Sequence, residues 1–101
     1  MPEFVKVARV ADLEPGRGRV VEVGGTRVAL FHCDGAVYAI KGSCPHMGGE
    51  LWEGKLTGDI VTCPWHGWRF NVKTGKNPAS EVVAVRTFEV RIEAGEVYVA
   101  V

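Results

Sequence analysis

The stretch Cys44–Trp68, CPHMGGELWEGKLTGDIVTCPWHGW, holds two of the three cysteines and two of the three histidines of this 101-residue chain. The four donors fall in two similar short segments, Cys44 with His46 and Cys63 with His66, and both segments contain proline and glycine. Proline fixes φ directly after each cysteine, and glycine permits backbone turns that other residues resist. The repetition predicts two loops that lie side by side and present sulfur and imidazole donors.

Two thiolates and two imidazoles suit either a tetrahedral zinc ion or an iron–sulfur cluster. Zinc modules usually pair cysteine with cysteine and histidine with histidine. Here each loop supplies one donor of each kind, which favours a binuclear cluster with both cysteines on one metal and both histidines on the other. A zinc site and a cysteine–histidine nucleophile remain as alternatives.

The rest of the chain favours β-strands, because apolar and polar residues alternate along short runs that turn signals separate. We expect hairpins around Gly24-Gly25, Asp34-Gly35 and Ala94-Gly95. The expected strands are 4–10, 19–23, 26–33, 36–41, 88–92 and 96–101, with two more around Gly58-Asp59 in 55–61. In 88–92 we expect Phe88, Val90 and Ile92 to face one side. The sequence therefore predicts an all-β fold, a small antiparallel sandwich or barrel.

A chain of 101 residues is expected to form one domain, here 1–101. We expect its basal β-domain to comprise 1–42 and 76–101, interrupted by a donor-bearing insert at about 43–72. The formal net charge of zero offers no bulk attraction to nucleic acid or to an anionic membrane.

Neither a signal peptide nor a membrane-spanning stretch is evident, so a cytoplasmic location is expected. Because disulfides are rare in a reducing compartment, we do not expect the three cysteines to form them. Cys33 lies outside both donor segments, and we expect it to be a small buried hydrophobe.

The pattern C-P-H-x-G … C-P-W-H-G-W, followed by F-x-x-x-T-G from Phe70 to Gly75, resembles the signature of Rieske [2Fe–2S] proteins. The resemblance covers roughly the whole chain and implies the Rieske fold and one [2Fe–2S] cluster. It makes Cys44 and Cys63 the ligands of the inner iron, and His46 and His66 the ligands of the outer, solvent-facing iron. His32 matches no motif position and is expected to be structural or exposed.

Departures from the respiratory branch of the family point to the soluble, low-potential branch. Respiratory members carry two further cysteines, at the positions of Gly49 and Trp65, which join the two loops by a disulfide. They also carry hydroxyl groups at the positions of Trp68 and Phe70, which donate to sulfur. Without these groups, the loops are expected to be held by packing and hydrogen bonds, and the reduction potential is expected to be low.

The resemblance implies an electron carrier and not an enzyme. Rieske oxygenase subunits need a second, mononuclear iron bound by two histidines and a carboxylate, and only His32 remains once the cluster ligands are assigned. The expected partners are an NAD(P)H-dependent flavoprotein reductase and a terminal oxygenase, with neither nucleic acid nor membrane involved. The alternative is the small, non-catalytic subunit of an assimilatory nitrite reductase.

A docking surface for these partners is expected at the tip that carries the two histidines. The residues expected to form it are Met47, Leu51, Trp52 and Trp65, with Glu50 and Glu53 nearby. Packing of some of these side chains onto the sheet is the competing expectation, above all for Trp52.

Overall fold

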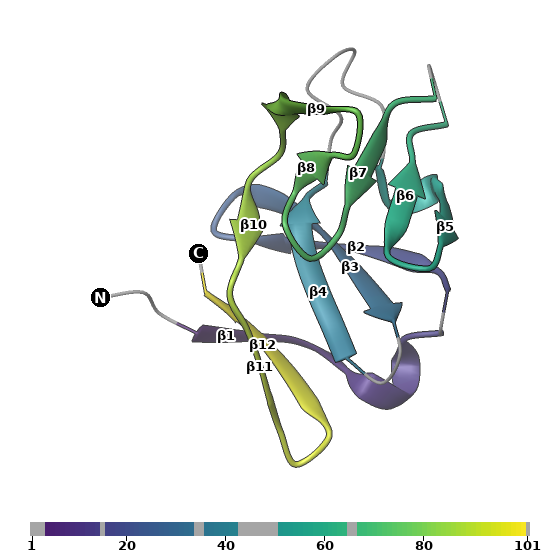
Figure 1. Ribbon diagram of the computed structural model, residues 1–101. Helices are drawn as coiled ribbons and strands as arrows, with labels where there is room; N and C mark the ends of the chain where they lie inside the picture. The colour runs from purple at the N-terminus through teal and green to yellow at the C-terminus, as the bar shows by residue number, and fades with distance from the viewer. Residues whose placement is uncertain (1–3, 15, 34–35, 43–50, 65–66, 101) are drawn as a thin grey trace.

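The computed structural model describes residues 4–14, 16–33, 36–42, 51–64 and 67–100. Its strands all pair antiparallel, and the described residues contain two short 3-10 helices but no α-helix, so the predicted all-β antiparallel fold is confirmed (Figure 1). The strands are β1 (Phe4–Arg9), β2 (Gly18–Val23), β3 (Thr26–Cys33), β4 (Ala36–Lys41), β5 (Lys55–Thr57), β6 (Ile60–Thr62), β7 (Arg69–Asn71), β8 (Lys76–Asn77), β9 (Ser80–Ala84), β10 (Thr87–Phe88), β11 (Val90–Glu93) and β12 (Glu96–Ala100). The 3-10 helices are η1 (Val10–Asp12) and η2 (Leu51–Glu53). None of the described helices is long and apolar enough to cross a membrane.

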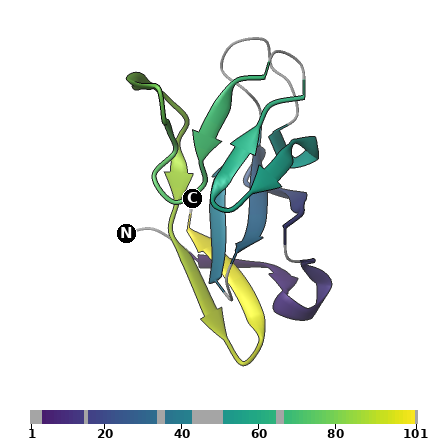
Figure 2. The ribbon, with the colours of Figure 1, turned by 45° about the vertical axis from the view of Figure 1, so that its right-hand side comes forward.

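The four-stranded sheet β10-β4-β3-β2 lies in the middle of the molecule (Figures 1 and 2). The sheet β1-β12-β11 lies below it in these views, and β5 to β9 lie above it. Strand β3 is buried on both faces: Val28 and Leu30 join a lower cluster with Val97 and Val99, whereas Phe31 joins an upper cluster. Because side chains alternate along a strand, the central sheet contributes side chains to both the upper and the lower cluster.

The upper cluster unites residues that are far apart in sequence. Its members are Ala29, Phe31, Cys33, Ile40, Leu51, Val61, Cys63, Phe70, Val72 and Val85. The lower cluster consists of Leu13, Val28, Leu30, Val37, Ala39, Phe88, Val97 and Val99. Val85, which follows β9, packs in the upper cluster with Phe70 and Val72.

The expected turns at Gly24-Gly25 and Ala94-Gly95 are confirmed. Strands β2 and β3 pair from Gly18↔Phe31 to Val23↔Thr26, and both glycines between them have positive φ, 56° and 82°. Such a two-residue turn matches the twist of the strands it joins, and glycine adopts it without strain. Ala94 and Gly95 also have positive φ, 51° and 77°, between the paired strands β11 and β12.

The expectation of one continuous strand over 88–92 is wrong. Phe88 ends β10 and pairs with Ala39 of β4, whereas Val90 begins β11 and pairs with Val99 of β12. The chain changes sheets at Glu89, whose carbonyl accepts a hydrogen bond from the Ala100 N–H at 3.0 Å. As a result Phe88 is buried, while Ile92 near the far end of β11 is 42% exposed.

A polar network on β1 and β12 yields a prediction about pH. The Lys6 ammonium donates to Glu96 Oε1 at 2.9 Å, and the Tyr98 hydroxyl donates to Glu96 Oε2 at 3.0 Å. These two hydrogen bonds hold the pKa of Glu96 below its ordinary 4.5, and the one from Lys6 has the larger effect. A carboxyl whose pKa is lowered by folding stabilises the protein above its unfolded pKa, and this stabilisation is lost as the pH falls through the folded pKa.

We therefore expect Lys6→Met to lower the melting temperature slightly at neutral pH and to leave it unchanged in acid below the lowered pKa. Thermal unfolding followed by circular dichroism at several pH values measures this. The pair is exposed, so added salt should shrink the difference. An equal decrease at acid and neutral pH would instead indicate that Lys6 acts through the packing of its aliphatic stem.

Candidate metal centre

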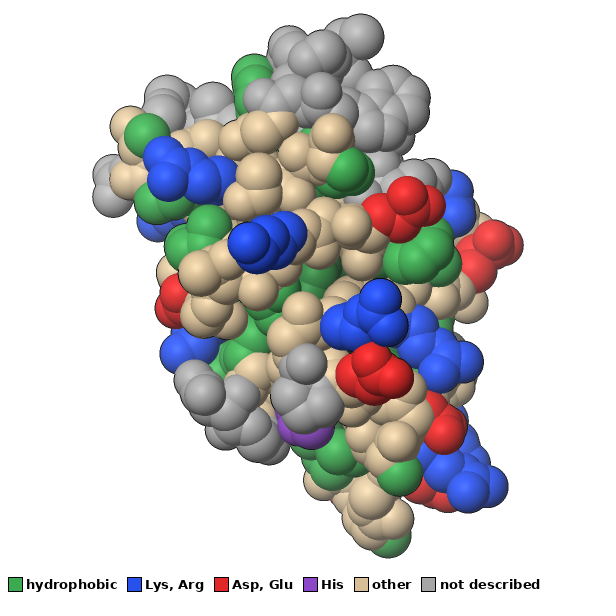
Figure 3. Space-filling model, turned by 90° about the vertical axis from the view of Figure 1, so that its right-hand side faces the viewer, with side chains coloured by type: hydrophobic (Ala, Val, Ile, Leu, Met, Phe, Trp, Pro, Cys, Tyr) green, Lys and Arg blue, Asp and Glu red, His purple; other side chains and the backbone are tan. Residues whose placement is uncertain are grey.

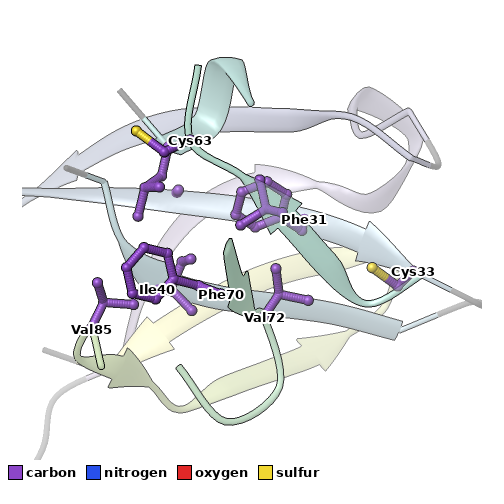
Figure 4. Close-up of a cluster of buried hydrophobic side chains, with 10 residues drawn as sticks. Phe31, Cys33, Ile40, Cys63, Phe70, Val72 and Val85 are labelled. Carbon is purple, nitrogen blue, oxygen red and sulfur yellow. The ribbon is translucent and has the colours of Figure 1, made fainter. Parts of the chain in front are cut away.

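Cys63, one of the four predicted ligands, follows directly after β6 and is 2% exposed. Cys63 belongs to the upper cluster, and Figure 4 shows it at the edge of this cluster with its sulfur directed away from Phe70 and Ile40. The backbone around it forms a closed turn: the Cys63 N–H donates to the Trp68 carbonyl at 2.7 Å, and the Gly67 N–H donates to the Cys63 carbonyl at 3.1 Å. Gly67 has a φ of 71°, a conformation that suits glycine. The second predicted loop is thus fixed at its base by β6, β7 and these two hydrogen bonds.

The first predicted loop is also closed at its base. The Leu51 N–H donates to the Gly42 carbonyl at 3.0 Å, so the residues on either side of the segment 43–50 are held together. The Gly42 N–H in turn donates to the Arg27 carbonyl at 2.9 Å, which ties this base to β3.

The two bases meet through η2 and the upper cluster. Leu51 is fully buried in the same cluster as Cys63. Gly54, which follows η2, lies so close to Thr62 that a Cβ on it would be 2.2 Å from the Thr62 carbonyl oxygen. The fold therefore brings the stems of both predicted loops together, and Cys63 in the second stem shares the upper cluster with Leu51 in the first.

Of the four predicted ligands, Cys63 lies in the described part of the chain, whereas Cys44, His46 and His66 lie outside the described residues. A buried cysteine at the end of a strand, beside the base of a second donor-bearing loop, fits a thiolate ligand of a cluster. A metal ion takes up the negative charge that an apolar surrounding would otherwise disfavour. The described residues thus fit the cofactor that the motif implies.

Leu51 is wrongly predicted as a docking residue. It begins η2, and its side chain points into the upper cluster, where it is 0% exposed. Trp52 is half-buried and packs against that cluster, as the competing expectation held, whereas Glu53, the last residue of η2, is exposed. Met47, Glu50 and Trp65 lie outside the described residues.

Two further histidine and cysteine side chains lie in the described part of the chain, His32 and Cys33. Both have structural roles, as predicted. The imidazole of His32 donates from Nδ1 to the Leu13 carbonyl at 3.1 Å, which ties β3 to the segment after η1. Cys33 is 6% exposed and belongs to the upper cluster. Figure 4 shows Cys33 well apart from Cys63 across this cluster.

The motif from Phe70 to Gly75 fixes the segment that follows the second loop. The Asn71 side-chain oxygen accepts hydrogen bonds from the N–H groups of Lys73 and Thr74, at 2.8 and 3.3 Å. Gly75 has a φ of 76°, donates to the Asn71 carbonyl and accepts from the Val85 N–H, both at 2.7 Å. This role of Asn71 was not predicted, although asparagine followed three residues later by Thr-Gly is a turn signal.

The described surface includes a small depression and a larger cleft. A shallow depression of about 190 Å³ beside the second loop is lined by Gly67, Trp68, Arg69, Asn77 and Ala79. A cleft of about 810 Å³ lies between the segment 12–19 and the residues Trp52 to Leu56. Its rim carries acids and bases alike, and Figure 3 shows both signs interspersed over this face.

Comparison with known proteins agrees with this geometry. The chain is 42% identical over 100 residues to the ferredoxin CarAc of Metapseudomonas resinovorans, covering 96% of this chain and 92% of that protein. It superimposes with a TM-score of 0.88 and 40% identity on a chain of the complex of reduced oxygenase and oxidized ferredoxin in carbazole 1,9a-dioxygenase, covering 96% and 92% of the two chains. A putative NADH-dependent nitrite reductase small subunit from Mycobacterium tuberculosis gives a TM-score of 0.92 at 27% identity, covering 100% and 96%.

The family comparison identifies the same domain, since residues 3–89 match the Rieske [2Fe-2S] domain. That match spans both donor-bearing segments and most of the strands around them. The chain belongs to the Rieske [2Fe-2S] domain family.

Proposed function

We propose that Cys44, His46, Cys63 and His66 hold one [2Fe–2S] cluster, with the two cysteines on the inner iron and the two histidines on the outer iron. When bound, this group accepts and releases a single electron. The observation that carries the proposal is the meeting of the two loop stems at Cys63 in one apolar cluster. The protein is an electron carrier and not itself an enzyme.

The residues around Cys63 govern how readily the site is reduced. The apolar side chains of the upper cluster exclude water from one side of this cysteine, so a change of charge there is weakly screened. The N–H groups of Cys63 and Gly67 both donate to carbonyls of their own turn and are therefore engaged. Trp68 and Phe70 bring no hydroxyl group, and Phe70 is fully buried. Fewer donors to sulfur leave the reduced, more negative state less stabilised.

We expect a reduction potential near the lower end of the range of about −150 to +300 mV that Rieske centres cover. A redox titration of the purified protein, followed by visible absorbance or circular dichroism, measures it. A clearly positive midpoint would contradict the assignment to the low-potential branch.

The electrons are proposed to come from an NAD(P)H-dependent flavoprotein reductase and to pass to a terminal oxygenase. The similarity over nearly the full length to a ferredoxin seen in complex with an oxygenase supports this order. The second candidate is that the chain carries electrons as the small subunit of an assimilatory nitrite reductase. The likeness to the M. tuberculosis protein supports this candidate. Both roles place the chain in the cytoplasm, where such reductases work.

The docking surface is proposed to surround His46 and His66, with Met47, Trp52 and Trp65 as its apolar part and Glu50 and Glu53 at its edge. Trp52 contributes only its exposed portion, because the rest packs against the upper cluster. A small apolar patch with a charged rim suits a weak, short-lived contact. We also propose the division into the basal part, 1–42 and 76–101, and the cluster-binding insert, about 43–72.

Co-purification of the protein from its native cell tests the two partner systems. An oxygenase and its reductase in the eluate would support the first role, and a flavoprotein that contains siroheme would support the second. Protein that is colourless and free of acid-labile sulfide after iron–sulfur reconstitution would overturn both and indicate a zinc-bound module. Replacement of Trp65 by lysine should slow electron transfer with the partner and leave the visible spectrum intact.

A further inference from the structure

The helix η2 touches the stems of both ligand loops. Its first residue, Leu51, donates its N–H to Gly42 at the base of the first loop. The residue after it, Gly54, donates to the Leu51 carbonyl at 3.0 Å and lies against Thr62, directly before Cys63. Figure 2 shows η2 as a short teal coil next to β5 and β6. This three-residue helix, which follows the first loop directly, and the glycine after it thus contact the chain on the upstream side of both loops.

Two glycines make these contacts possible. A Cβ on Gly18 of β2 would lie 2.5 Å from the Trp52 carbonyl oxygen and 2.7 Å from Cε1 of Phe31. A Cβ on Gly54 would lie 2.2 Å from the Thr62 carbonyl oxygen. Neither glycine has a positive φ, so alanine is excluded at both positions by space and not by backbone conformation.

The atoms that crowd these two positions belong mainly to backbone that cannot give way alone. Moving the Trp52 carbonyl displaces η2, and Leu51 in η2 is anchored in the cluster that also contains Cys63. Close-packed interiors transmit such shifts, because no void absorbs them. A displacement of η2 from β2 or from β6 therefore changes how the two loop stems stand relative to each other.

We propose that Gly18 and Gly54 are positioning residues for the cluster. By letting η2 pack directly on β2 and β6, they hold the two ligand loops in a fixed relation. The inference rests on the proposed function, since it concerns the geometry of the same four ligands.

The experiment compares two contact variants, Gly18→Ala and Gly54→Ala, with two matched controls, Gly24→Ala and Gly58→Ala. The control glycines have positive φ, 56° and 63°, and a Cβ on either would meet nothing within 4 Å. Alanine there costs stability through backbone strain but leaves η2 in place. All variants are purified with their cluster, and reduced-state EPR spectra and the rate of bleaching in the presence of an iron chelator are recorded.

We expect the contact variants to show altered g values and to bleach faster than the wild type by about tenfold or more. The controls should melt at lower temperature with unchanged g values and bleaching rate. Equal spectra and rates in all four variants, or a bleaching rate that follows melting temperature alone, would overturn the inference. A wild-type protein without iron and sulfide would instead refute the proposed function, which separates the two failures.

Gly42→Ala provides a milder variant in case the contact variants do not fold. A Cβ on Gly42 would lie 3.0 Å from the Arg27 carbonyl oxygen, a contact that a small shift can accommodate. Because the Gly42 carbonyl accepts the Leu51 N–H, that shift still reaches η2. Faster bleaching in Gly42→Ala than in Gly58→Ala supports the inference by itself, and equal rates overturn it.

Discussion

Replacement of Cys63 by alanine is expected to abolish cluster binding. Cys63 is 2% exposed at the end of β6, so no other side chain can take its place from solvent. Alanine keeps the backbone turn with Trp68 and Gly67 but removes the sulfur, and three ligands cannot complete the two irons. The purified variant should lack visible absorbance and give no EPR signal after dithionite. Its melting temperature should fall to that of the apoprotein, because a bound cofactor stabilises the native state.

The matched control for this experiment is Cys33→Ala. Cys33 is 6% exposed and belongs to the same upper cluster, so both variants lose a buried sulfur of the same volume. Cys33 lies outside the ligand motif, and we expect its variant to keep the wild-type spectrum with a modest loss of stability, about 1 kcal/mol. Iron and sulfide retained by Cys63→Ala with an unchanged spectrum would contradict the ligand assignment, and loss of colour in both variants would indicate a packing effect.

The strands were predictable from sequence where a local turn determines the pairing. Gly24-Gly25 and Ala94-Gly95 join neighbouring strands, so both the turn and the register follow from a few residues. The change of sheet at Glu89 was not predictable in this way, because it depends on β10 pairing with β4 and β11 pairing with β12. Alternation alone assigns Phe88 and Ile92 to one strand and carries no information about distant partners.

The candidate site shows the same difference between local and tertiary information. The ligand motif lies within one short stretch and could be recognised there, whereas Leu51 was expected on the docking surface because it lies close to the ligands in sequence. The 3-10 geometry of η2 turns Leu51 into the core instead. The burial of β3 on both faces had a local signal, since VALF, residues 28–31, is a continuous apolar run.

Replacement of Phe70 by alanine is expected to lower the stability of the protein and to change its cluster together. Phe70 is fully buried and pairs across β6 and β7 with Val61, which is also fully buried. Deleting a buried phenyl group costs about 3–5 kcal/mol, from the lost transfer energy and the cavity that remains. That is a large share of the roughly 5–15 kcal/mol by which a domain of this kind is stable. Urea denaturation of the holoprotein measures the loss.

Phe88→Ala separates the general effect of a core cavity from an effect on the site. Phe88 is 7% exposed and packs in the lower cluster, on the other face of the central sheet from Phe70 and Cys63. Both variants should lose stability, but only Phe70→Ala should alter the reduced EPR spectrum and speed the loss of the cluster, since its cavity opens in the cluster of side chains around Cys63. The same spectral change in both variants would mean that the two cores respond as one unit, and an unchanged spectrum in both would mean that the upper cluster does not support the metal site.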